Sequence, residues 1–339
     1  MANKVMEVKN LKKYFPINKG FFGKPKDYVK AVDDVSFFVK EGETLGLVGE
    51  SGCGKTTLGR CIVKAIDSTA GEIIYHSLGG KEYDIAKLQG KELRSLRKEI
   101  QMVFQDPYAS LDPRMTVYDI IAEPLKVNFD PNEFDFDERI KELAKIVGLN
   151  IEHLKRYPHA FSGGQRQRIG IARALTTYPR LIVADESVSA LDVSVQAQVL
   201  NLLKKLQQQM NLTYIFIAHD LSVVHHISDR VAVMYVGQTV ELAKTQDLFS
   251  KPLHPYTEAL ISAVPMPDPR NKMERIILEG EVPNPANPPN GCYFHPRCPY
   301  AKENNRMAKC SEIKPEFVEV EKDHFVACHY AKELKLKSV

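Results

Sequence analysis

Short runs of apolar residues alternate along the chain with segments whose apolar positions recur every three or four residues. Five segments have the β-branched, apolar character of strands: residues 31–40, 44–49, 100–105, 180–185 and 213–220. Helical patterns cover residues 56–66 and 194–209, and a turn at Glu41–Gly42 joins the first two strands. Because strands alternate with helices, the sequence predicts an α/β domain with a largely parallel sheet.

The rest of the chain is less regular. Residues 107–160 are mostly polar and helical in pattern, and "SGGQRQRIGIARAL" predicts a helix that begins after Ser162. Nine of the twenty prolines lie between Pro252 and Pro289. Because proline removes backbone hydrogen bonds from helices and sheets, this run predicts an extended linker.

Length and composition limit the possible functions. With 339 residues the chain is long enough for a large core plus an appendage. Its net charge of +3 is too small to indicate nucleic acid or an anionic membrane as a partner. The start, "MANKVMEVKN", lacks the apolar stretch of a secretory signal, and the apolar runs are far shorter than the ~18–20 residues that span a bilayer. We therefore expect a soluble cytoplasmic protein.

"GESGCGKT" at residues 49–56 fits the phosphate-binding pattern G-x-x-x-x-G-K-[ST]. It follows a predicted strand and opens a predicted helix, which is the context that this motif requires. Lys55 supplies a positive charge for the terminal phosphates, and the Thr56 hydroxyl is suited to Mg²⁺. The residues expected to bind the nucleotide here are Gly49, Glu50, Ser51, Gly52, Cys53, Gly54, Lys55, Thr56 and Thr57.

A second motif, which ends in two acidic residues, complements this loop. "RLIVADE" is an apolar strand that ends in Asp185 and Glu186. Asp185 suits the coordination shell of Mg²⁺. Glu186 is placed to orient or deprotonate an attacking water, which predicts hydrolysis of the nucleotide rather than transfer to a second substrate.

"FSGGQRQRIGIARAL" at residues 161–175 resembles the signature motif of ABC-type ATPases, and the order of the other motifs agrees. The resemblance implies that Gln105 of "VFQDP" contacts Mg²⁺ and the reacting groups, and that His219 of "IAHD" is the switch histidine. It also implies nucleotide contacts for Phe15, which would stack on adenine, for the signature residues Ser162, Gly163, Gly164 and Gln165, and for Asp192 of "SALD".

The same resemblance implies the fold and assembly. We expect a P-loop NTPase (RecA-like) core with an antiparallel β subdomain and a helical subdomain at about residues 106–165. Two such domains are expected to pack head to tail, with each ATP between one P-loop and the other signature. The chain departs from the usual pattern at Phe161, where leucine is commonest, and at Ser187, where proline would stiffen the position of Glu186.

The tail resembles a particular subfamily. "KPLHPYTEALISAVPMPDP" (251–269) and "CYFHPRCPYA" are similar to the extension of the ATPase subunits of oligopeptide and dipeptide importers. We therefore expect an ATPase domain at residues 1–250 and an extension at 251–339. The implied partners are two transmembrane permease subunits, a second related ATPase subunit or a second copy of this chain, and an extracytoplasmic peptide-binding protein. The chain would lie peripherally at the cytoplasmic face of a bacterial inner membrane.

Other functions remain open at this point. The same machinery could import nickel or a glycoside, since other subunits recognise the cargo. A soluble ABC ATPase that acts on ribosomes or DNA is a further alternative. The single ATPase cassette, and the lack of a long coiled-coil insertion, favour transport over both DNA repair and translation.

Four of the six cysteines lie near the C-terminus with the spacing Cys-x5-Cys-x11-Cys-x17-Cys. A reducing compartment favours metal ligation over disulfides, but the spacing fits neither a zinc ribbon nor the compact ferredoxin run. The residues alone therefore predict a four-thiolate site for an unspecified metal. The family resemblance implies a [4Fe–4S] cluster held by Cys292, Cys298, Cys310 and Cys328, with Zn²⁺ and no metal as alternatives. Such a metal would staple a tail with few apolar residues.

Overall fold

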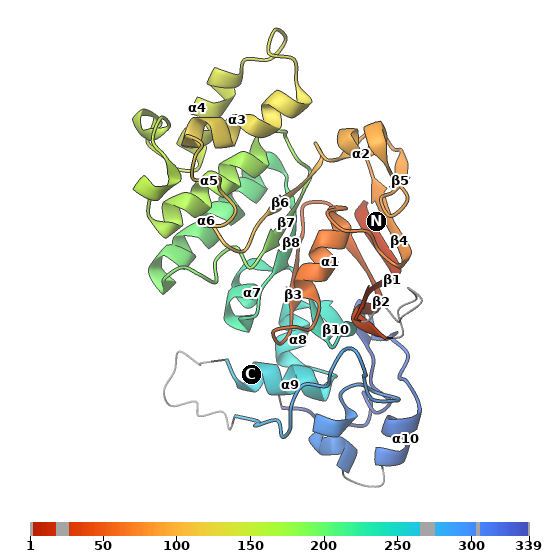
Figure 1. Cartoon of the computed structure of the whole chain (residues 1–339). Coiled ribbons are helices and arrows are strands. Elements are labelled where there is room, and N and C mark those ends of the chain that lie inside the picture. The colour runs from red at the N-terminus through yellow and green to blue at the C-terminus, as the bar shows by residue number, and fades with distance from the viewer. Residues whose placement is uncertain (1–2, 18–26, 265–274, 303–305, 338–339) are drawn as a thin grey trace.

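The computed structural model describes residues 3–17, 27–264, 275–302 and 306–337 (Figure 1). Prolines 265, 267 and 269 of the predicted linker lie outside the described residues. No helix in the described part of the chain is both long and apolar enough to cross a membrane.

The central sheet has eight strands in the order β11-β12-β10-β9-β3-β8-β7-β6. Its strands are β3 (Thr44–Val48), β6 (Ile100–Val103), β7 (Leu181–Asp185), β8 (Thr213–Ile217), β9 (Arg230–Tyr235), β10 (Gln238–Lys244), β11 (Val318–Glu321) and β12 (His324–Val326). From β9 to β6 neighbouring strands are parallel, which confirms the predicted arrangement of the core. From β9 to β11 the pairing is antiparallel, so the C-terminal hairpin extends the ATPase sheet through β10.

A second, antiparallel sheet has the order β2-β1-β4-β5. Its strands are β1 (Lys4–Pro16), β2 (Tyr28–Lys40), β4 (Ala70–His76) and β5 (Glu82–Asp84). This sheet confirms the expected antiparallel β subdomain. Its apolar side chains share a core with α1 and one face of the central sheet, because Val8, Leu58 and Val183 belong to one buried cluster.

Helices surround the central sheet and form a separate lobe. They are α1 (Lys55–Ile62), α2 (Gly90–Leu96), α3 (Val117–Asn128), α4 (Phe136–Ile146), α5 (Gly163–Leu175), α6 (Val193–Met210), α7 (Leu221–Ile227), α8 (Thr245–Ser250), α9 (Pro255–Ser262) and α10 (Met307–Glu312), with short 3₁₀ turns η1 (Ile151–His153), η2 (Pro158–Ala160), η3 (His295–Arg297) and η4 (Pro299–Lys302). Figure 1 shows α3, α4 and α5 together at the top left, above the end of the sheet that carries β6. This lobe confirms the expected helical subdomain.

The linker prediction is wrong over its first part. Helix α9 forms inside the proline-rich run and is buried along most of its length. Pro255 occupies the first turn, where the missing N–H would have no helical partner, and the ring nitrogen Nδ1 of His254 accepts the N–H of Tyr256 over 3.0 Å. Residues 275–291 have no regular helix or strand, as predicted.

Candidate functional site

The P-loop connects β3 with α1 and depends on two of its glycines. Gly49 and Gly54 have φ angles of 152° and 101°. A Cβ at Gly49 would lie 2.2 Å from the Met234 carbonyl oxygen, and one at Gly54 would lie 1.9 Å from that of Ala31. The loop can therefore curl tightly only with glycine at both positions.

Lys55 points back into this loop. Its Nζ donates to the carbonyl oxygens of Gly49 (2.7 Å) and Glu50 (3.0 Å) and lies 3.6 Å from Cys53 Sγ. The side chain is 4% exposed, so its charge is held inside the curl where phosphates are expected. Burial raises the pKa of the Cys53 thiol, so this cysteine stays protonated and unreactive inside the loop.

The two predicted magnesium ligands from the P-loop and β7 lie together. Thr56 Oγ1 donates to Asp185 Oδ1 over 2.9 Å, although the residues are 129 positions apart. Asp185 is 1% exposed. Burial raises its pKa, although the hydrogen bond from Thr56 acts in the opposite direction. A cation at this point would stabilise the ionised carboxylate, and a hydroxyl next to a carboxylate is a donor set that suits Mg²⁺.

Glu186 lies at the centre of the predicted catalytic residues. Gln105 Nε2 donates to Glu186 Oε2 over 2.8 Å, and His219 Nδ1 lies 3.4 Å from the same oxygen. The His219 side chain is 55% exposed and Glu186 15% exposed, so the group faces solvent on one side. Glu186 has a φ of 41°, a strained left-handed conformation that is held by its N–H bond to the Ile217 carbonyl (2.9 Å).

Ser187, which departs from the usual family pattern, is 2% exposed. Its hydroxyl oxygen has no hydrogen-bond partner within the described residues. The side chain of Glu186 is nevertheless held by Gln105. The suggestion that Ser187 loosens Glu186 stays a prediction.

The signature motif forms the first turn of α5. Ser162 Oγ accepts the N–H of Gln165 (3.4 Å), and Gln165 Oε1 accepts the N–H of Ser162 (3.1 Å), so the predicted serine cap is a complete capping box. A Cβ at Gly164 would lie 2.3 Å from Val195 Cγ1, which explains why this turn carries glycine. Gly163 follows the cap directly. Helix α5 packs on α3 and α4, whereas α1 lies against the sheet (Figure 1).

Two further predicted nucleotide contacts lie on exposed surface. Asp192 caps α6, since its Oδ1 accepts the N–H of Val195 over 3.0 Å, and this bond lowers the pKa of Asp192. Phe15, near the end of β1, is 38% exposed, and Lys13 Nζ lies 4.8 Å from the centre of the Phe15 ring. Both positions are free to meet a ligand, and their roles stay predictions.

All six cysteines carry free thiols, and the four C-terminal ones line one cavity. The cavity is completed by His254, Phe294, His295 and Tyr330, among others. Burial, with the proximity of the other thiols, raises the pKa of Cys292 and Cys328 to about 12 and that of Cys298 to about 11. Four thiolates in so small a space would need cations to balance their charge.

In the arrangement seen, the described residues contain no group of three or more His, Cys, Asp or Glu side chains that could hold a metal ion. Binding of a metal would therefore require the four thiols to turn toward a common centre. The donor set itself fits, because ligation by four cysteine thiolates is typical of [4Fe–4S] clusters and of structural zinc.

Two family descriptions match the chain: "ABC transporter" over residues 32–189, and "Oligopeptide/dipeptide transporter, C-terminal region" over residues 240–304. The oligopeptide transport ATP-binding protein AppF of Bacillus subtilis is 56% identical over 96% of this chain and 97% of that protein. The chain belongs to the ATP-binding proteins of the oligopeptide/dipeptide ABC transporter family. The oligopeptide transport ATP-binding protein OppF of Haemophilus influenzae is 51% identical over 96% of each chain.

Solved structures agree with this family. A dimeric structure of the ATP-binding cassette MJ0796, in a post-hydrolysis state bound to ADP and Pi, superposes with a TM-score of 0.60 at 28% identity. It covers 71% of this chain and 98% of the other. The predicted ABC ATPase fold, its P-loop core and its assignment as an ATP-hydrolysing enzyme are thus confirmed.

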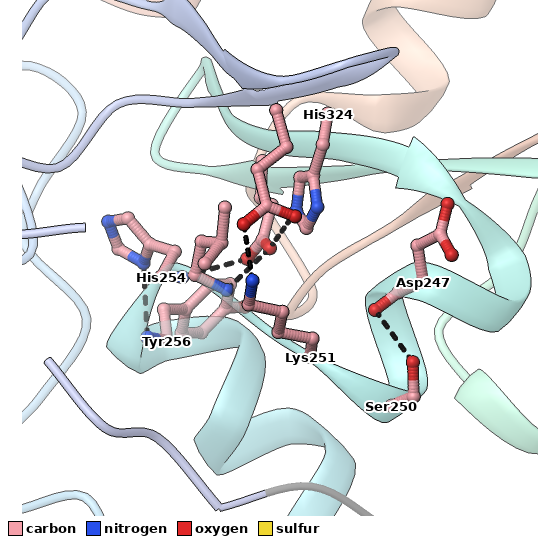
Figure 2. A network of polar contacts seen from close by, with 9 residues as sticks. Asp247, Ser250, Lys251, His254, Tyr256 and His324 are labelled. Carbon is pink, nitrogen blue, oxygen red and sulfur yellow. Dashed lines mark hydrogen bonds and ion pairs between the residues drawn. The ribbon is translucent and has the colours of Figure 1, made fainter. Parts of the chain in front are cut away.

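Sequence reasoning missed the residues that join β10 to the segments that follow it. Glu241 of β10 is fully buried, and its carboxylate accepts the N–H groups of Leu253 (2.7 Å) and His254 (2.9 Å). His324 Nε2 of β12 lies 2.7 Å from the same carboxylate. Figure 2 shows this network, with the His254 ring directed away from His324 toward the start of α9.

A second missed contact reaches the P-loop. The backbone N–H of Glu50 donates to Tyr256 Oη over 2.8 Å, and the Arg297 guanidinium pairs with the Glu50 carboxylate. The only sequence signals were the "HPY" triplet and a single arginine in "FHPRC". Neither pattern identifies a partner more than 200 residues earlier.

Proposed function

We propose that the chain hydrolyses ATP at a head-to-tail dimer interface and thereby drives the import of di- and oligopeptides through membrane permease subunits. The observation that carries this proposal is the assembly of two pairs from distant segments. Thr56 lies against Asp185, and Gln105 lies against Glu186. A nucleotide bound at Lys55 would have its phosphates beside both pairs.

Each residue then has a chemical task. Lys55 and the N–H groups of the P-loop bind phosphates. Thr56, Asp185 and Gln105 would hold Mg²⁺, which would neutralise charge on the phosphate oxygens. Glu186 accepts a proton from the attacking water. His219, beside the same carboxylate oxygen, senses the γ-phosphate.

A second phosphate-binding turn supports the proposed dimer. Ser162, Gly163, Gly164 and Gln165 open α5 with N–H groups suited to an anion. These residues would act on ATP held by the other subunit, with Asp192 at the interface and Phe15 against adenine. Such a nucleotide-bridged contact closes with ATP and opens after hydrolysis. The second subunit is a related ATPase or a second copy of this chain.

The proposed cargo rests on the names of the relatives, since AppF and OppF are described as oligopeptide transport proteins. This favours peptides over nickel, glycosides, or a soluble role on ribosomes or DNA. The complex would contain two permease subunits and an extracytoplasmic peptide-binding protein. The chain would lie peripherally at the cytoplasmic face of the membrane, with its ATPase domain at residues 1–250 and its extension at 251–339.

The extension is proposed to hold a [4Fe–4S] cluster through Cys292, Cys298, Cys310 and Cys328, with Zn²⁺ as the alternative. The four thiols share one cavity, and their mutual repulsion as thiolates would be relieved by a cationic cluster. The cluster would link the segments between Cys292 and Cys328, which bury few apolar side chains of their own.

Transport is tested by placing the chain and its permease subunits in lipid vesicles and measuring uptake. ATP-dependent accumulation of a labelled peptide, absent without the peptide-binding protein, is expected. Accumulation of Ni²⁺ or a glycoside instead of peptide would contradict the cargo. Failure of the chain to copurify with permease subunits would contradict the transport role.

The cluster is tested on the anaerobically purified protein. We expect about four irons per chain, absorbance near 400 nm, and loss of both in Cys298→Ser, whereas Cys61→Ser, which alters a buried thiol far from the cavity in sequence, keeps them. One zinc per chain would favour the alternative, and no metal in the purified protein would contradict the proposal.

A further inference from the structure

Arg297 links the P-loop to the segment of the chain that begins at Cys292 and contains Cys298, here called the cysteine segment. It ends η3, directly before Cys298. Its Nη1 and Nη2 donate to the two carboxylate oxygens of Glu50 over 2.8 and 3.2 Å, and Nη1 also donates to Tyr235 Oη over 3.4 Å. The Arg297 side chain is 8% exposed, so this ion pair is largely shielded from water. A paired contact of this type fixes the direction of the carboxylate as well as its distance.

Glu50 itself is fixed at three points. Arg297 holds its carboxylate, Tyr256 Oη accepts its N–H over 2.8 Å, and its carbonyl oxygen accepts Lys55 Nζ over 3.0 Å. Two of these three partners come from the extension. Tyr256 therefore orients, from outside the ATPase motifs, the Gly49–Glu50 peptide group, whose carbonyl oxygen also accepts Lys55 Nζ over 2.7 Å.

The position of Arg297 depends in turn on how the cysteine segment packs. Phe294, three residues before it, is 1% exposed and contacts the rings of Tyr235 and Tyr256, with centroids 5.2 and 5.4 Å apart. The N–H of Cys292 donates to the Cys310 carbonyl over 2.8 Å. These contacts hold η3 against the P-loop. The position of Arg297, and with it that of Glu50, therefore depends on how the residues around the cysteine cavity fold.

We propose that Arg297 is a positioning residue of the ATP site, which holds Glu50 so that the P-loop and Lys55 keep the conformation that binds nucleotide phosphates. The inference rests on the ATPase function proposed above and adds the extension to the nucleotide site. Gln105, Glu186 and His219 are held by other contacts. Loss of Arg297 should therefore weaken ATP binding and leave the hydrolytic step nearly unchanged.

The test measures the Kd for ATP by equilibrium titration, with kcat and KM, in Arg297→Gln, Glu50→Gln and the double variant. Each single variant is expected to raise Kd and KM about tenfold, with kcat within about twofold of the wild type. The double variant should bind no more weakly than the weaker single variant, because both changes break one contact. Arg297→Lys keeps the positive charge but cannot form the paired contact with both carboxylate oxygens. Its Kd for ATP should lie between those of the wild type and Arg297→Gln.

Lys302→Gln is the matched control in the same extension. It removes an exposed ion pair with Glu279 and should leave Kd unchanged. Glu50→Gln keeps the extension intact, so it remains informative if Arg297→Gln fails to fold.

Two results would overturn the proposal. One is a Kd within twofold of the wild type in Glu50→Gln or in folded Arg297→Gln. The other is tighter binding in Glu50→Gln with wild-type affinity in the double variant, which would show that Arg297 only neutralises a charge near the phosphates. Because Kd is measured without turnover, a wild-type chain that binds but does not hydrolyse ATP would contradict the proposed function alone.

Discussion

The ATPase domain and the C-terminal extension are stabilised in different ways. Every residue of β3, β7 and β8 is buried, and these strands supply a continuous apolar core. The extension buries far fewer apolar residues, and it also buries charged and polar side chains, among them His254, Glu258, Arg297 and His324. Its own separate apolar cluster contains only a few buried residues.

This difference shows that the extension folds on the ATPase domain. Tyr256 and Phe294 belong to the large apolar cluster of the central sheet, and β12 pairs with β10. Polar contacts such as Glu241 with His324 then fix the direction of each segment. A region with little core of its own is stabilised by its neighbour and constrains that neighbour in return.

The largest expected effect lies in the ATPase domain alone. Glu186→Gln should lower kcat by about 10²–10⁴-fold, because the neutral amide cannot accept the proton of the attacking water. ATP should still bind and trap the closed dimer. Turnover assays and gel filtration with ATP measure both properties. A near wild-type rate would show that Glu186 is not the base, whereas Lys55→Ala should weaken binding itself.

The next largest effect should come from the junction between the two regions. Glu241→Ala leaves two backbone N–H groups and His324 without their buried acceptor, and we expect a loss of roughly 3–5 kcal/mol in the free energy of unfolding. Urea unfolding measures this loss.

Glu321→Ala is the control for this junction. It removes the exposed partner of Lys251, and Lys251 is labelled in Figure 2; this change should alter stability by no more than about 0.5 kcal/mol. Equal effects of the two substitutions would contradict the idea that buried polar contacts join the regions.

The sequence predicted the ATPase domain far better than the extension, for a physical reason. In "TLGLVGESGCGKT" and "RLIVADE" the functional residues directly follow a strand in the sequence. The strand pattern therefore also predicts where these residues lie, at the end of the strand. Helix α9 was missed because prolines were taken to exclude a helix, although Pro255 sits where a helix tolerates it. The contact of Glu50 with Arg297 spans 247 residues and leaves no periodic signal.

The signature turn gives a smaller effect within the ATPase domain. Gly164→Ala should cost about 1–3 kcal/mol, because the added Cβ would lie 2.3 Å from Val195 Cγ1 and α5 must move from α6. Gly170→Ala in the same helix has open space and should stabilise it by about 0.5–1 kcal/mol. Thermal unfolding of the pair measures this, and a destabilised Gly170→Ala with an unchanged Gly164→Ala would contradict it.

The smallest expected effect concerns Ser187. Its buried hydroxyl oxygen lacks a partner in the described part of the chain, so Ser187→Ala should be neutral or stabilising by up to about 1 kcal/mol. The value of kcat should stay within about twofold. A large loss of activity would show that the hydroxyl acts on Glu186.

The coupling between the two regions is tested most directly by amide hydrogen exchange in the P-loop of Tyr256→Phe. This substitution keeps the buried ring and removes only the oxygen that accepts the Glu50 N–H. We predict faster exchange in the peptide that contains residues 49–56, together with a higher Kd for ATP. Wild-type exchange and wild-type ATP affinity in this variant would contradict a role of the extension in shaping the nucleotide site.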